Sequence, residues 1–305
     1  MKTLQTSVVV AIILACYACS ASTKSLEPQT DQGAQPNRGA ASQYPDSKLF
    51  YDFFVKEETL SYNGYQITKS SKKVRIEGVD RGVQVTYASL RNKSHVLATF
   101  DGLYHSVGNA TDFGLASLLG GDSKQLVVSQ TVPRGGRHWV ADLQSDGAVL
   151  FDSGDYGLGR EEAFVMDVDK DGISEIGLVL TAFWGFGPVA MADHRVMPMI
   201  VFKYDPQLRR YLPANPFFAY GLEHLEEDAS DVDSAETPGD ALNSEYLGKR
   251  LAILLHYIYA GKRDEGWAFF DKTYRLSDSR KMKSQIQKRL QSEPVYKFIY
   301  GKNAN

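Results

Sequence analysis

Residues 164–180 read FVMDVDKDGISEIGLVL, and this stretch decides the fold. Its middle places Asp167, Asp169 and Asp171 at alternate positions, followed by a glycine for a sharp turn and by Glu175. Apolar runs with the composition of buried strands flank the loop on both sides. The stretch therefore predicts a strand, an acidic turn and a second strand.

The acidic turn is a candidate metal site. Carboxylates at alternate positions, a glycine at the sharp turn and a backbone carbonyl after it form an oxygen cage that suits a hard cation. The predicted ligands are Asp167, Asp169, Asp171, the carbonyl of Ile173, and Glu175. Calcium is the natural occupant, as a structural ion; a solvated turn and a catalytic or switching ion are the alternatives. An EF-hand does not fit, because Leu178 stands where its last glutamate would be.

Other parts of the chain repeat this pattern. Residues 113–128 line up with residues 164–179, about 50 positions later, and a hairpin at residues 88–97 lines up in the same way with residues 141–150. A third hairpin, residues 200–212, follows at a slightly longer interval. Period-two alternation and frequent turn residues across the region predict short strands. We therefore expect a mainly β domain of three units with four strands each.

A loop of the form Asp-x-Asp-x-Asp-Gly-x-x-Glu between strands, at this interval, resembles the FG-GAP and VCBS class of β-propeller repeats. The resemblance spans residues 85–213 and implies blade-like units with calcium bound at the edge of a blade. Only the later copy keeps the ligands, because Ser117, Leu119 and Gly121 replace the three aspartates in the earlier one. Three blades are fewer than the four to eight of a closed propeller, so an open assembly, a sandwich variant and completion by a partner are all alternatives.

The N-terminus has the pattern of an export signal. Lys2 precedes an apolar run, residues 8–15, that is too short to span a bilayer. The residues before Cys16 resemble the lipobox of bacterial lipoproteins, which predicts cleavage and lipidation at Cys16; plain cleavage near Cys19 is the alternative. We expect an exported bacterial envelope lipoprotein, held to the membrane by its N-terminal lipid, and otherwise a periplasmic or secreted protein.

Composition divides the chain into five segments. A stretch rich in Ser, Gln, Pro and Gly cannot offset its ordering entropy by burial, which predicts a flexible tether. A later acidic run without Lys or Arg is typical of a solvated linker, and apolar residues at period 3.6 follow it, with Asp278 as the cap of a third helix. The predicted segments are the signal peptide 1–21, the tether 22–49, the β-repeat domain 50–218, the acidic linker 219–242 and a helical domain 243–305.

One loop between strands combines aromatic and charged side chains, the mixture that interfaces favour. Its candidate interaction residues are Phe183, Trp184, Phe186, Met191, His194 and Arg195. Burial of this loop in the core of the protein is the alternative.

Net charge and residue types limit the classes of function that the chain can have. A formal net charge of −3 argues against a general nucleic-acid binder. Beyond Cys16 and Cys19 there is no cysteine, which excludes a thiol nucleophile there, and the pattern contains no convergent nucleophile and base. We therefore predict no catalytic residues and a binding or scaffolding role for an unknown protein or glycan partner. The alternative is an envelope hydrolase whose site combines dispersed residues at the mouth of the β domain.

Overall fold

A computed structural model describes residues 47–102, 104–133, 135–158, 163–189, 196–222, 225–234 and 244–301. The chain divides into two compact units, Met1–Arg38 and Gly39–Asn305, and all described residues belong to the second. The signal peptide, Cys16 and most of the tether lie outside the described residues, as do Met191, His194 and Arg195.

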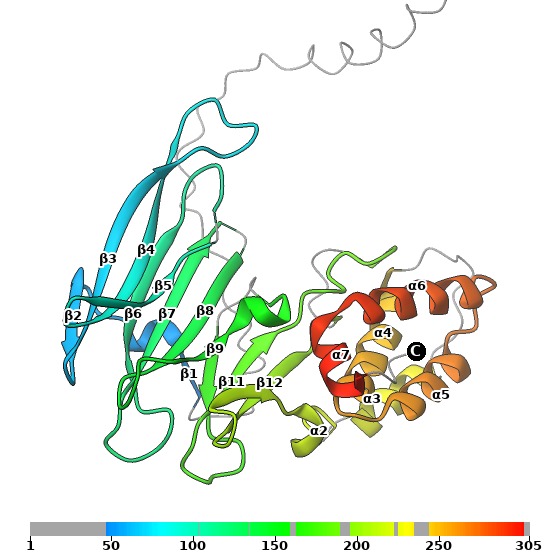
Figure 1. The fold of residues 1–305 in the computed structure, drawn as a ribbon. Helices are drawn as coiled ribbons and strands as arrows, with labels where there is room; N and C mark the ends of the chain where they lie inside the picture. The colour runs from blue at the N-terminus through cyan, green and yellow to red at the C-terminus, as the bar shows by residue number, and fades with distance from the viewer. Residues whose placement is uncertain are drawn as a thin grey trace, which may run out of the picture. The chain divides into compact units, whose positions relative to one another are not determined.

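Three antiparallel sheets follow one another along the chain (Figure 1). The first contains β2 (Thr59–Tyr62), β3 (Tyr65–Val74), β4 (Val83–Asn92) and β5 (His95–Phe100). The second contains β6 (Ala110–Ala116), β7 (Gln125–Val132), β8 (Gly135–Asp142) and β9 (Val149–Asp152). The third contains β10 (Phe164–Met166), β11 (Glu175–Val179), β12 (Met199–Asp205) and β13 (Arg210–Pro213). The expected mainly β region is confirmed, with three antiparallel sheets.

The third sheet has a fifth strand that the sequence pattern did not predict. Strand β1 (Lys48–Leu49) pairs with β10, so the last two residues of the predicted tether are part of this sheet. Short 3-10 helices, η1 (Phe50–Phe53) and η2 (Ser153–Tyr156), follow β1 and β9. The arrangement does not show a closed propeller.

Hydrophobic clusters hold the sheets together, and the alternation along β7 and β8 explains why. Leu126 and Trp139 belong to a cluster that also contains Ile67 and Leu90 of the first sheet. Val127, the next residue of β7, belongs to a larger cluster with the third sheet and the helices. Because successive strand residues point to opposite faces, the second sheet contributes to a core on each side.

The C-terminal region is helical, as its apolar periodicity predicts. Its helices are α2 (Asn215–Phe218), α3 (Leu225–Ser234), α4 (Ser244–Tyr259), α5 (Arg263–Thr273), α6 (Ser279–Ser292) and α7 (Pro294–Tyr300). Asp278 is the N-cap residue of α6, as expected, although its side chain makes no capping hydrogen bond. Helix α3 lies within the predicted acidic linker, where Leu225 and Val232 are buried in a cluster with Ile253 of α4. No helix in the described part of the chain is both long and apolar enough for a bilayer crossing.

The aromatic half of the predicted interaction loop packs into the protein. Phe183 is fully buried in the large cluster, and Trp184 and Phe186 pack against that cluster with part of their surface exposed. Arg289 of α6 donates a hydrogen bond to the Ala182 carbonyl at 2.7 Å, which joins this loop to the helices. Burial removes Phe183 from the surface that a partner could reach.

Candidate functional site

The acidic loop connects β10 to β11, as the sequence pattern predicts. Its backbone turns through Lys170 and Gly172, whose φ angles are +58° and +85°. Asp167 accepts a hydrogen bond from the Gly172 N–H at 3.1 Å, and Asp171 accepts one from the Ile173 N–H at 2.8 Å. Two of the predicted ligands therefore also shape the turn itself.

Glu175, at the start of β11, is a fully buried carboxylate. One oxygen, Oε2, accepts a hydrogen bond from the Val168 N–H at 2.8 Å, which ties the end of the loop to its beginning. Burial raises the pKa of Glu175, and the Val168 hydrogen bond and the charge of Lys203 oppose this rise without cancelling it. If this carboxyl group is ionised, a cation close by compensates its buried charge.

The structure supplies that cation as Lys203 of β12, a residue that the sequence reasoning did not select. Its Nζ donates to Asp169 Oδ2 at 2.7 Å, to Asp171 Oδ2 at 2.8 Å and to Glu175 Oε1 at 3.3 Å. The rings of Phe217 and Phe218 lie 5.8 and 5.6 Å from the same nitrogen. The ammonium group is thus held between three carboxylates and two aromatic rings.

This environment shifts the titration of Lys203 and Asp171. Partial burial lowers the pKa of Lys203, but the hydrogen bonds to Asp169 and Asp171 and the charge of Glu175 outweigh it and raise the pKa. The hydrogen bond from Lys203 also lowers the pKa of Asp171, with a smaller contribution from the Ile173 N–H. Lys203 is therefore charged, and Asp171 ionised, at neutral pH.

The residues fit a metal ion in part. Asp167, Asp169 and Glu175 each offer an oxygen, and these oxygens lie within 4.8 Å of one another. Oxygen ligands of this kind suit calcium. Two of the three carboxylates, however, already bond to Lys203. Calcium binding stays a prediction, and the structure adds a competitor for its ligands.

The equivalent loop of the second sheet lies between β6 and β7 and has the same internal hydrogen bond. Gln125 is fully buried at the position of Glu175, and its Oε1 accepts hydrogen bonds from the N–H groups of Leu118 at 2.8 Å and Leu119 at 3.2 Å. Here the buried side chain is a neutral amide. The two aligned loops therefore share a hydrogen bond from a backbone N–H to a buried side chain, but that side chain is neutral in one loop and acidic in the other.

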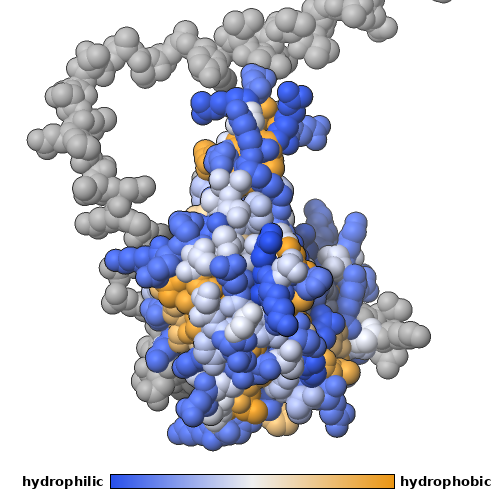
Figure 2. Space-filling model, turned by 60° about the vertical axis from the view of Figure 1, so that its left-hand side comes forward, coloured by the Kyte–Doolittle hydropathy of each residue, from blue (hydrophilic) through white to orange (hydrophobic). Residues whose placement is uncertain are grey.

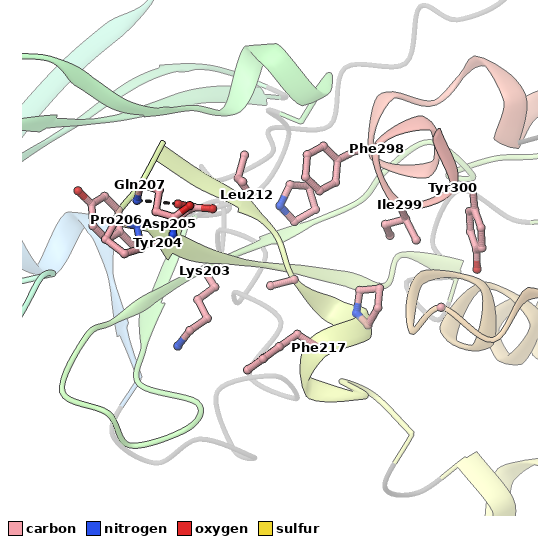
Figure 3. A pocket seen from close by; sticks show the side chains of 14 residues that line it. Lys203, Tyr204, Asp205, Pro206, Gln207, Leu212, Phe217, Phe298, Ile299 and Tyr300 are labelled. Atoms are coloured by element: carbon pink, nitrogen blue, oxygen red, sulfur yellow. Dashed lines mark hydrogen bonds between the residues drawn. The ribbon is translucent and has the colours of Figure 1, made fainter. Parts of the chain in front are cut away.

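A groove of about 740 Å³ opens on the other side of Lys203 (Figure 3). Phe217 of α2, Phe298 of α7 and Leu212 of β13 line the groove. Phe217 is 72% exposed and Phe298 is 46% exposed. Gln207, in the turn between β12 and β13, contributes an amide to its lining. Figure 3 shows the amino group of Lys203 directed away from Phe298.

Elsewhere, exposed apolar residues are scattered. Seen from the side of the first sheet, the surface is largely hydrophilic, with hydrophobic residues in small separate patches (Figure 2). Val96 and Val107 are exposed there, by 50% and 71%. Single exposed apolar side chains are normal on soluble domains, whereas rings that face a common groove are not.

A serine and a histidine do meet, but inside the protein. The Ser129 Oγ lies 2.8 Å from the Nδ1 of His138, and both side chains are buried. Neither residue lines the groove, and the ring of Phe50 packs edge-on against His138. This pair joins β7 to β8 and has no access for a substrate.

Comparisons with known proteins find no match. No family model, no curated protein and no solved structure is similar to this chain at a significant level. The resemblance to FG-GAP and VCBS repeats therefore stays a prediction from the sequence.

Proposed function

We propose that this chain is a non-catalytic binding protein that takes a neutral ligand into the groove between β13, α2 and α7. The observation that carries the proposal is the exposure of Phe217 and Phe298 toward one cavity. Binding sites for small ligands have volumes of roughly 300–1,000 Å³ and combine apolar walls with a few polar groups. The groove has this size and this lining.

The charged residues of the groove are already engaged, which favours an uncharged ligand. Lys203 is neutralised by the carboxylates of the acidic loop. Asp205 Oδ1 accepts hydrogen bonds from the backbone N–H groups of Gln207 and Leu208, at 2.8 and 3.0 Å. An apolar peptide segment or an uncharged glycan, contacting the two rings and the Gln207 amide, is the ligand chemistry that this lining suits.

Only the sequence indicates the cellular location of the protein. Export and lipidation at Cys16 would place the groove at a bacterial envelope, where protein and glycan ligands are both abundant. In this proposal the acidic loop has a structural role, because its cation fixes the turn between β10 and β11 in the sheet that carries the groove. A calcium ion or the ammonium group of Lys203 can supply that charge.

Binding can be tested on immobilised arrays of uncharged glycans and of apolar peptides. Wild-type protein should bind members of at least one array, and Phe217→Ser with Phe298→Ser should lose these ligands. Neither ring is part of the buried core, since Phe217 is 72% and Phe298 46% exposed, so the double variant should keep its far-UV circular dichroism. Val107→Ser, which removes an apolar side chain that is 71% exposed outside the groove, is the matched control and should bind normally. Binding that is indifferent to the groove residues, or no binding at all, would contradict the proposal.

A further inference from the structure

We propose that the ammonium group of Lys203 is the resident cation of the acidic loop, and that a divalent metal ion must compete with it for the same oxygens. This inference concerns the loop alone, and it does not depend on any ligand in the groove. It also goes beyond the calcium prediction, because it names a residue that sets the affinity for the ion.

The contacts of Lys203 are those that a bound metal would need. Nζ lies 2.7 Å from Asp169 Oδ2 and 3.3 Å from Glu175 Oε1, and both residues belong to the group of three whose oxygens could hold an ion. Asp171, the third carboxylate on Lys203, is also a predicted ligand. A metal ion would have to displace the ammonium group or share these oxygens with a second positive charge.

The second sheet contains an internal control for this arrangement. In the register of β7 and β8, Gln125 pairs with Asp142. In β11 and β12, Ile176 pairs with Phe202, so Glu175 and Lys203 lie opposite each other one position further along. A lysine is present opposite the buried carboxylate, and none opposite the buried amide. This correlation within one chain is expected if Lys203 exists to neutralise the loop.

Energetics favour the tethered cation at ordinary calcium levels. Breaking a buried ion pair by removing one partner is strongly unfavourable, because it leaves an uncompensated charge, and among the described residues Glu175 has no other ion-pair partner than Lys203. Lys203 is fixed on β12, so it meets the carboxylates without the entropy cost of bringing in a free ion. Extracellular-type calcium sites bind only at roughly 10⁻⁴–10⁻³ M even without such a competitor.

The test titrates calcium into the full wild-type chain and into the Lys203→Met variant. Calorimetry measures the affinity for calcium, and thermal melts measure the stability. The wild-type melt should change little between chelator and 10 mM calcium, a level about tenfold above the weak end of that affinity range. Lys203→Met should melt lower in chelator, recover when calcium is added, and bind calcium at least tenfold more tightly than the wild type. Lys203→Gln, which keeps a hydrogen-bond donor but no charge, should behave in the same way and replaces the methionine variant if that one fails to fold.

Lys124→Met is the matched control, because Lys124 belongs to the equivalent loop of the second sheet, where its Nζ donates to Ser117 Oγ at 2.7 Å. It should leave the calcium response unchanged. Equal calcium affinities in the wild type and both Lys203 variants would overturn the proposal. So would tight binding by the wild type, or folded Lys203 variants that do not respond to calcium. Failure of the array experiments would leave these outcomes untouched.

Discussion

The loops at residues 117–125 and 167–175 share one hydrogen bond but differ in charge. In each, a buried side chain at the end of the loop accepts a hydrogen bond from the backbone N–H seven residues earlier, Gln125 from Leu118 and Glu175 from Val168. The amide needs nothing more, whereas the carboxylate is accompanied by a lysine. The hydrogen bond is therefore the shared structural requirement, and the charge is an addition that must be balanced.

The two loops also touch, so neither can change freely. The Ser174 N–H donates a hydrogen bond to the Leu118 carbonyl at 2.7 Å. A Cβ atom added to Gly120, whose φ is +77°, would lie only 3.0 Å from the Gly172 carbonyl oxygen. Both the left-handed backbone and this close approach require glycine at position 120. The contact couples the turn of the second sheet to that of the third.

Among the variants that test this comparison, Gln125→Glu should cause the largest change in the free energy of unfolding. The new carboxylate would be buried opposite Asp142, without a lysine, and the nearby Arg209 already bonds to Asp142 and Asp146. An uncompensated buried charge of this kind costs about 3–5 kcal/mol. Urea denaturation at neutral pH should show a loss of unfolding free energy in that range.

Glu175→Gln is the matched control in the other loop. It keeps an oxygen for the Val168 N–H and leaves Lys203 with Asp169 and Asp171, so it should cost far less than Gln125→Glu. Equal losses for the two variants would mean that charge is not what distinguishes the loops.

A second buried carboxylate, Glu293, sharpens the comparison, because the lysine near it, Lys297, acts through its charge and forms no salt bridge with it. Glu293, the N-cap residue of α7, accepts hydrogen bonds from the Tyr296 N–H at 2.7 Å and the Tyr259 hydroxyl at 3.2 Å. It forms no ion pair with the described part of the chain. Burial raises the pKa of Glu293 above its ordinary value of 4.5, and these hydrogen bonds only partly oppose the rise.

A raised carboxyl pKa means that the folded state favours the protonated form. The stabilising contribution of Glu293 is therefore complete below its ordinary pKa and is lost as the pH rises through the folded-state pKa. Glu293→Gln stays neutral, so it should be more stable than the wild type at pH 8 and melt at a higher temperature. The gain in unfolding free energy should be smaller than the loss in Gln125→Glu. The difference from the wild type should vanish near pH 4. Glu245→Gln, in an exposed pair with Lys249, should show no such trend. A Glu293→Gln difference that is constant across pH would contradict this assignment.

The sequence was sufficient for the strands around the acidic loop and for the repeat, because both depend on local alternation and spacing. The flanks predicted at residues 164–166 and 176–180 agree closely with β10 and β11. Lys203 was not predicted, because its role depends on the register between β11 and β12, two strands that residues 180–198 separate in the sequence. A search for cations opposite Glu175 in the repeat alignment could have found it.

The groove was also beyond sequence reasoning, for a related reason. Phe217 and Phe298 are 81 positions apart and belong to two short helices that the periodicity did not predict. The sequence left Phe183 either in an interaction surface or in the core, because aromatic content alone does not distinguish an exposed loop from a buried one. The tertiary contacts of the helices decide that question.

The smallest expected effect comes from returning one carboxylate to the neutral loop. Ser117 stands at the position of Asp167, and its Oγ already accepts a hydrogen bond from Lys124. Ser117→Asp would convert this contact into a partly exposed ion pair, which is worth about 0.2–1 kcal/mol. The variant should therefore gain a few tenths of a kcal/mol in urea denaturation at low salt, and the gain should fade near 1 M salt, where the screening length is about 3 Å. Ser117→Asn, a neutral acceptor, and Ser117→Asp combined with Lys124→Gln should both lack the gain. If the gain survives removal of Lys124, it arises from the turn backbone and not from charge, and the two loops differ less in their electrostatics than Lys203 suggests.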